Sequence, residues 1–319
     1  MSKVTIAAVG DVSTGHDPAE RIFSHVMAPL ARSDVRFAQA ERVYSERGAY
    51  QEQVISKHSR QHPRMAEAFR RAGFDVVSIA SNHSGSWGPE SVEDTAETFR
   101  ALGIASIGAG SSIAAARKPA LVERNGVRMA FLGYCSVLLP QTWATETRAG
   151  AAPMRAHTFY EAKEFQPGAP PRVVTTAHAA DLAALVEDVR RAKQSADVVL
   201  VSLHWGVHFV PAPCDYQREV AHAAIDAGAS VILGHHPHQP QGIEAYKDGI
   251  VFYSMGNFGS FRRSRQKSGH FFAAPNGEYT FEEMYTIEPD PGFVFPHNRH
   301  YDESGIYLIE ADARGVAAV

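Results

Sequence analysis

Residues 228–238 of the 319-residue chain read Gly-Ala-Ser-Val-Ile-Leu-Gly-His-His-Pro-His, an apolar run that ends in histidines. A short apolar run that is rich in β-branched residues is typical of a buried strand. The histidines would then stand at the carboxyl end of that strand. We therefore expect a strand over residues 230–233 with imidazole groups at the point where it leaves the sheet.

The same arrangement recurs at four other predicted strands. Polar residues of metal-binding type follow each apolar run: Asp11 after 4–9, Glu41 after 35–38, Ser81-Asn82-His83 after 75–80, and His204 after 197–203. The carboxyl ends of strands in an open α/β sheet meet in one crevice. With 16 histidines in the chain, one histidine at a strand end carries little weight, but five coincidences favour a shared metal site.

Strands alternate with segments of helical periodicity, which predicts an α/β layered domain. Further strands are expected at 104–107, 127–132 and 250–254, and helices at 17–32, 63–72, 89–102, 179–195 and 216–227. Asp17, Pro18 and Glu20 predict the start of the first helix. Residues 136–178 and 259–303 lack periodicity and are predicted to be long loops. We interpret residues 1–319 as one domain.

Composition narrows the class of protein. Apolar residues make up 45%, charged residues 21%, and the net charge is −4, which gives no support for a nucleic-acid partner. The longest strongly apolar stretch, 198–210, is shorter than the ~20 residues that span a bilayer. The two cysteines, Cys135 and Cys214, indicate neither a disulfide framework nor a cysteine zinc site. We expect a cytoplasmic protein with no membrane anchor and, since no nucleotide-binding motif is visible, no organic cofactor.

Several of these segments resemble the calcineurin-like metallophosphoesterase superfamily, and within it the CapA family known from poly-γ-glutamate capsule synthesis. The resemblance covers residues 4–258. It is carried by Gly10-Asp11-Val12, Ser81-Asn82-His83, His204-Trp205-Gly206, residues 228–238 and Tyr253-Ser254-Met255-Gly256-Asn257-Phe258. It implies an α/β calcineurin-like layered sheet sandwich flanked by helices.

The resemblance also implies a site. The metal ligands would be Asp11, Glu41, Asn82, His204, His235 and His238, with His236 as an additional histidine. His83 would be a general acid/base paired with Asp11, and His204 would share in catalysis. Related phosphoesterases carry Asp-x-His at the first strand, where this chain has Ser13, and Glu41 replaces a bridging Asp. We therefore expect one divalent ion rather than two: calcium, manganese or zinc.

Three functions are compatible with such a site. The first is a CapA-type role in poly-γ-glutamate synthesis, but members in that role are typically tethered to a membrane. The second is phosphoester hydrolysis, which Ser13 argues against. The third follows from a family member that epimerises the C-terminal tryptophan of a lasso-peptide precursor without an organic cofactor. Our main hypothesis is this metal-dependent peptide epimerase, with the other two functions as alternatives.

Epimerisation at Cα needs one group to remove the proton and a second group to return it from the opposite face. His83 with Asp11 would be one pair, and His297 and His300 lie near Asp302 and could supply a second. The substrate would be a precursor peptide. Its C-terminal carboxylate would be bound by the basic loop, with Trp205 as a further contact; the loop cations are Arg262, Arg263, Arg265 and Lys267.

Each of these assignments has a simpler interpretation. The basic loop could be a solvated surface, Trp205 could be a core residue, and His297 and His300 could lie in a surface loop. A binding protein that holds peptides at an inactive metal site is the non-enzymatic alternative.

Overall fold

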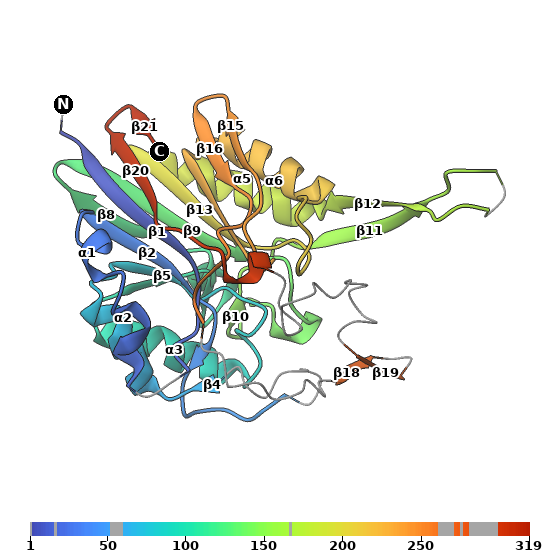
Figure 1. Ribbon diagram of the computed structural model, residues 1–319, viewed down its shortest axis with the longest axis horizontal. Helices are drawn as coiled ribbons and strands as arrows, with labels where there is room; N and C mark the ends of the chain where they lie inside the picture. The colour runs from blue at the N-terminus through green and yellow to red at the C-terminus, as the bar shows by residue number, and fades with distance from the viewer. Residues whose placement is uncertain are drawn as a thin grey trace.

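The computed structural model describes residues 2–15, 18–51, 60–165, 168–260, 271–274, 277–280 and 299–319. Two large sheets dominate these residues (Figure 1). The first has the order β21 (Gly315–Ala318), β20 (Tyr307–Asp312), β1 (Val4–Val12), β2 (Val35–Ala40), β5 (Val76–Ser78) and β6 (Ala105–Ile107), and β17 (Asn257–Gly259) pairs with β1. The second has the order β15 (Ile243–Tyr246), β16 (Gly249–Phe252), β14 (Val231–His235), β13 (Val198–His204), β9 (Val127–Cys135) and β8 (Ala120–Arg124).

Helices and short sheets complete the described fold. The helices are η1 (Ala19–Phe23), α1 (Met27–Leu30), η3 (Pro63–Ala66), α2 (Glu67–Arg71), α3 (Pro89–Ala101), α4 (Ile113–Ala116), η4 (Pro140–Thr142), α5 (Ala179–Lys193), α6 (Asp215–Asp226) and η5 (Arg299–Asp302). The short strand pairs are β3 (Val43–Tyr44) with β4 (Arg60–Gln61), β7 (Ala109–Gly110) with β10 (Gly150–Ala151), β11 (Ala156–Glu161) with β12 (Arg172–Ala177), and β18 (Phe271–Ala274) with β19 (Gly277–Thr280). Within the described residues, no helix is long and apolar enough to cross a membrane.

The inner faces of the two sheets pack against each other. Side chains of a strand alternate between its two faces, and Val4, Ile6 and Ala8 of β1 share a buried cluster with Leu200 of β13 and Leu233 of β14. Phe37 of β2 also stacks on Phe131 of β9, with 6.0 Å between ring centroids. The sheets therefore form a sandwich whose core lies between them.

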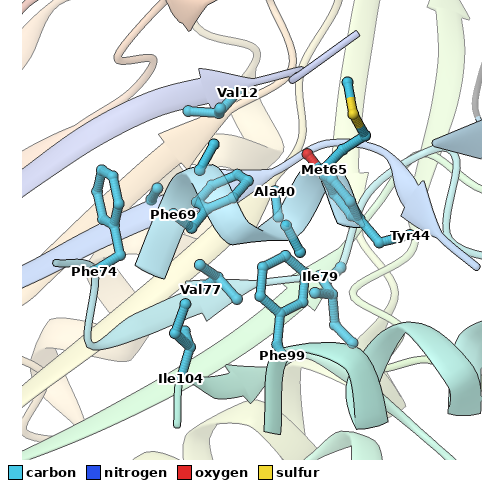
Figure 2. Packing of buried hydrophobic residues seen from close by; sticks show 14 of the residues in the cluster. Val12, Ala40, Tyr44, Met65, Phe69, Phe74, Val77, Ile79, Phe99 and Ile104 are labelled. Atoms are coloured by element: carbon cyan, nitrogen blue, oxygen red, sulfur yellow. The ribbon is translucent and has the colours of Figure 1, made fainter. Parts of the chain in front are cut away.

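Helices cover both outer faces of the sandwich. On the first sheet, Figure 2 shows Phe69 of α2 and Phe99 of α3 with Val77 of β5; the two phenyl rings meet edge to face at 5.4 Å. On the second sheet, Leu185 of α5 and Val220 of α6 belong to a separate buried cluster. The helix, sheet, sheet, helix order confirms the predicted layered sandwich.

Two local predictions are wrong. The helix expected at 17–32 is replaced by η1 and α1, because Pro29 lacks the N–H that a continuous helix needs. Asp17 lies outside the described residues. The loop expected at 136–178 contains the hairpin β11–β12, which projects from the body of the molecule in Figure 1. Most of the loop expected at 259–303 lies outside the described residues.

Gly10 shifts the register of β1. Val9 pairs with Ala38 but Asp11 pairs with Gln39, so Gly10 is the extra residue of a bulge. The bulge turns Asp11 toward the space between the sheets, while Val12 packs with Val9 on the helix side. A Cβ on Gly10 would lie 2.0 Å from the Gly256 carbonyl oxygen, so only glycine permits this close approach.

We predict that Gly10→Ala lowers the free energy of unfolding by about 3 kcal/mol, because backbone has to move away from the added methyl group. Gly242→Ala is the matched control, since a Cβ there would meet no atom within 4 Å. Urea denaturation of both variants measures the difference. Equal stabilities would show that the approach of β1 to Gly256 is not a constraint.

Candidate functional site

The inner faces of the sheets turn from apolar to polar at their carboxyl ends. Strand alternation gives these series: Val198, Leu200, Ser202 and His204 on β13; Val231, Leu233 and His235 on β14; Phe37, Gln39 and Glu41 along and after β2. The polar ends of the three series remain buried. The site is therefore a continuation of the inter-sheet core in which polar side chains replace hydrocarbon.

Asp11 lies at the centre of this polar end. Its Oδ1 is 3.8 Å from His235 Nδ1 and 3.9 Å from His204 Nδ1, and its Oδ2 is 3.8 Å from His238 Nδ1. These separations are too long for hydrogen bonds. Among the described residues, Asp11 accepts a hydrogen bond only at Oδ2, from the backbone N–H of His236 at 3.1 Å. Three imidazoles thus surround the carboxylate without bonding to it.

The outer nitrogens of two histidines are bonded to amide oxygens. His204 Nε2 lies 3.1 Å from Asn82 Oδ1, and His238 Nδ1 lies 2.8 Å from Asn257 Oδ1. Because an amide oxygen only accepts, each of these nitrogens carries the proton in a neutral ring. The opposite nitrogens then have lone pairs near carboxylates: His204 Nδ1 near Asp11, and His238 Nε2 at 3.3 Å from Glu41 Oε1. Two acceptors that face each other need a proton or a cation between them.

Six buried polar atoms of the site have no hydrogen-bond partner among the residues that the structure describes. They are Asp11 Oδ1, Glu41 Oε1, His83 Nδ1, His204 Nδ1, and both ring nitrogens of His235. Buried polar groups without partners are costly, and all six are carboxylate oxygens or imidazole nitrogens, the kinds of atom that ligate divalent metals. Among the described residues, however, no group of three or more His, Cys, Asp or Glu side chains is arranged to hold an ion. The donors therefore fit a cation in kind, and an ion would have to draw them closer.

Burial keeps five histidines of the site uncharged. It lowers the pKa of His83 and of His235 to about 3, and it lowers the pKa values of His204, His208 and His236 well below 6.5. A neutral imidazole is the form that binds a metal. The ring of His208 lies 4.0 Å from that of His236 and 5.0 Å from that of His238, centroid to centroid.

The pKa values of the two carboxylates are shifted in opposite directions. Burial, and then repulsion from Glu41, raises the pKa of Asp11 well above 3.8. Burial also raises the pKa of Glu41, but the guanidinium of Arg42 and the neighbouring histidines outweigh it and lower the pKa to about 2. Since burial keeps most of those histidines neutral at neutral pH, we attribute the ionised state of Glu41 to Arg42.

The expected His83–Asp11 pair is replaced by other contacts. His83 Nε2 lies 3.0 Å from Arg42 Nη1 and 3.8 Å from Glu41 Oε1. Because a guanidinium only donates, His83 Nε2 is the acceptor and Nδ1 holds the proton. This arrangement occupies the nitrogen that a general base would use.

Predicted residues outside this cluster have other surroundings. Trp205 is fully buried, its indole N–H donates to the Tyr253 carbonyl oxygen at 2.8 Å, and its ring stacks on Tyr253, so it lies in the core rather than at an exposed contact surface. His300 is exposed, with Nδ1 2.7 Å from Glu303 Oε2. His297 and the basic loop of Arg262, Arg263, Arg265 and Lys267 lie outside the described residues.

The structure adds residues that the sequence did not single out as functional. Arg42 follows Glu41, His208 lies four residues after His204, and Asn257 fixes His238. Asn257 also donates from Nδ2 to the carbonyl oxygens of His238 and Tyr301. The signal for Asn257 was its place in the motif that ends at Phe258, whereas Arg42 and His208 had only their neighbours to indicate them.

The family described as "Bacterial capsule synthesis protein PGA_cap" matches residues 5–261. The chain belongs to this family. It is 29% identical over 266 residues to "Capsule biosynthesis protein CapA" of Bacillus anthracis, covering 80% of the chain and 59% of that protein. It is 30% identical over 259 residues to "PGA biosynthesis protein CapA" of Bacillus subtilis (strain 168), covering 78% and 61%.

The chain thus spans about 60% of the length of these two CapA relatives. Among solved structures, the Staphylococcus aureus protein named "Putative 5'-Nucleotidase" aligns with a TM-score of 0.50 at 12% identity, over 81% of this chain and 49% of that one. Such a likeness shows a shared fold and nothing more. It agrees with the calcineurin-like sandwich expected for this member of the PGA_cap family.

We predict that the metal-free protein loses stability as pH falls from 6.5 toward 3. Histidines with pKa values near 3 in the folded state and 6.5 in the unfolded state bind more protons when unfolded, so stability rises with pH in this window. Asp11 opposes the trend because its folded pKa is raised, but it is one group against His83 and His235.

Urea denaturation between pH 7 and pH 4.5 in the presence of a chelator measures this slope. His235→Gln should lower the slope by up to ~1.4 kcal/mol per pH unit, the value for one proton. An unchanged slope in that variant would mean that His235 is not held neutral by burial.

Proposed function

We propose that this chain is a metal-dependent, hydrolase-type enzyme that acts on a glutamate-containing polymer in capsule-type synthesis. The observation that carries the metal is the pairing of acceptors across the site, Asp11 with His204 and Glu41 with His238. The family and the names of the CapA relatives support the polymer as substrate. Together they rank this function above the other candidates.

The residues of the site would have different roles, some in binding the metal and others in positioning its ligands. Asp11, His204, His235, Glu41 and His238 would hold a divalent ion, and Asn82 would fix the ring of His204. The ion would polarise a carbonyl or phosphoryl oxygen of the substrate. Asn257 holds the ring of His238 in place. The donor set does not decide among calcium, manganese and zinc.

The peptide-epimerase hypothesis ranks lower than the sequence suggested. The CapA relatives are named for capsule and polymer biosynthesis, and neither name refers to epimerisation. Two-sided proton transfer also requires two acid/base pairs. Of those expected, His83 is bonded to Arg42, and His300 is exposed beside Glu303.

We predict that a divalent ion stabilises the protein through the site. At a free ion concentration of 100 times the Kd, binding to the folded state adds about 2.7 kcal/mol to the free energy of unfolding. Asp11→Asn and His235→Ala should lose this gain. His222→Ala should keep it, because His222 pairs with Glu244 outside the site.

Thermal unfolding with calcium, manganese or zinc, together with elemental analysis, tests the prediction. We expect about one ion per wild-type chain. A wild type that carries no ion and gains no stability from any of the three would rule out the metal site.

We predict that the metal-loaded protein cleaves poly-γ-glutamate and that Asp11→Asn slows cleavage roughly a hundredfold or more, because the ion supplies several kcal/mol of charge stabilisation. New chain ends are counted by mass spectrometry, with His222→Ala as the control. A phosphodiester and a peptide in heavy water are assayed in parallel. Phosphate release alone would favour a phosphoesterase, and deuterium uptake at a single Cα would restore the epimerase.

A further inference from the structure

Arg42 is held inside the site by groups from three strand ends. Its Nε–H donates to Ser13 Oγ at 3.0 Å, after β1, and its Nη1 donates to His83 Nε2 at 3.0 Å, after β5. Its Nη2 lies 3.9 Å from Glu41 Oε2, beyond hydrogen-bond distance. The guanidinium is therefore fixed in orientation before any ligand arrives.

This arrangement leaves donors of Arg42 available. A guanidinium has five N–H groups, and two of them make the bonds above. Within the described part of the chain, the other three donate to no residue. The side chain of Arg42 is 22% exposed, whereas that of Glu41 is 4% exposed. The side chain of Arg42 is thus partly open to solvent, while the neighbouring carboxylate is buried.

The chemistry of a guanidinium determines which ligands it can bind. Arginine stays charged at any pH at which proteins fold, and its planar fork matches the two oxygens of a carboxylate or phosphate. The three N–H groups without a described protein partner can donate to water or to a ligand. A ligand that carries an oxyanion would satisfy them.

We propose that Arg42 is the oxyanion-binding residue of the site, and that it receives a carboxylate or phosphate group of the substrate on the N–H groups of its guanidinium that donate to no described residue. The proposal deepens the proposed function, which places an ion beside Arg42. The charge of the guanidinium does not depend on that ion. Binding of an oxyanion can therefore be measured with and without metal.

The test compares wild type, Arg42→Gln and Arg42→Lys, with Arg100→Gln as the matched control. Arg100 is an exposed arginine of α3 that pairs with Glu97, so its loss changes the net charge equally without touching the site. Isothermal titration calorimetry with inorganic phosphate and with glutarate gives the Kd in manganese and in chelator. Circular dichroism checks that each variant is folded.

We expect both the wild type and Arg100→Gln to bind at least one of the two anions. Arg42→Gln should bind it about ten- to a hundredfold more weakly, as expected for a lost charge-assisted bidentate contact. Arg42→Lys should lie between them because it keeps the charge and loses the fork. The tighter anion identifies the group that the site takes, carboxylate or phosphate.

Two results would overturn the proposal: equal anion affinity in wild type and Arg42→Gln, or no binding of either anion by wild type. If Arg42→Gln does not fold, an unweakened Arg42→Lys overturns it instead. A wild type that binds an anion through Arg42 but takes up no metal would refute the proposed metal enzyme and leave the role of Arg42 standing.

Discussion

The burial of Asp11 between two sheets is the constraint on which the site depends. Its position requires the bulge at Gly10, and the bulge requires the close approach of Gly256. Once the carboxylate is buried, histidines from β13 and β14 surround it at distances that no hydrogen bond satisfies. Burial also keeps those rings neutral. Backbone geometry at one glycine thus fixes both the place and the charge state of the centre.

Strand alternation explains why so much of the fold could be predicted from the sequence. The apolar runs that end in Asp11, His204 and His235 are long and regular, and hydrophobic periodicity is the signal that they carry. The prediction failed where local signals compete. Pro29 breaks a helix that the sequence pattern otherwise favours, and the hairpin β11–β12 has exposed residues such as Phe159 and Tyr160 that give no inward-facing pattern.

The sequence indicated which residues would come together in the site better than it indicated which side chains would bond to each other. The rule that strand ends converge brought Asp11, His204 and His235 together correctly. It does not say which side chain bonds to which. His83 was expected to pair with Asp11, yet its ring is bonded to Arg42, since the arginine that follows Glu41 extends across the end of β2. Such choices depend on side-chain geometry, which residue spacing does not encode.

The contacts of Arg42 also give a reason for Ser13, which stands where related phosphoesterases carry a histidine. A serine at that position supplies a hydroxyl that fixes the guanidinium, and Glu41 lies beside the same group. A cation is therefore already part of the fold where two carboxylates would otherwise repel each other. Because arginine cannot release its charge, this part of the site stays positive whether or not an ion is bound. A fixed guanidinium beside Glu41 agrees with our proposal of one metal ion rather than two.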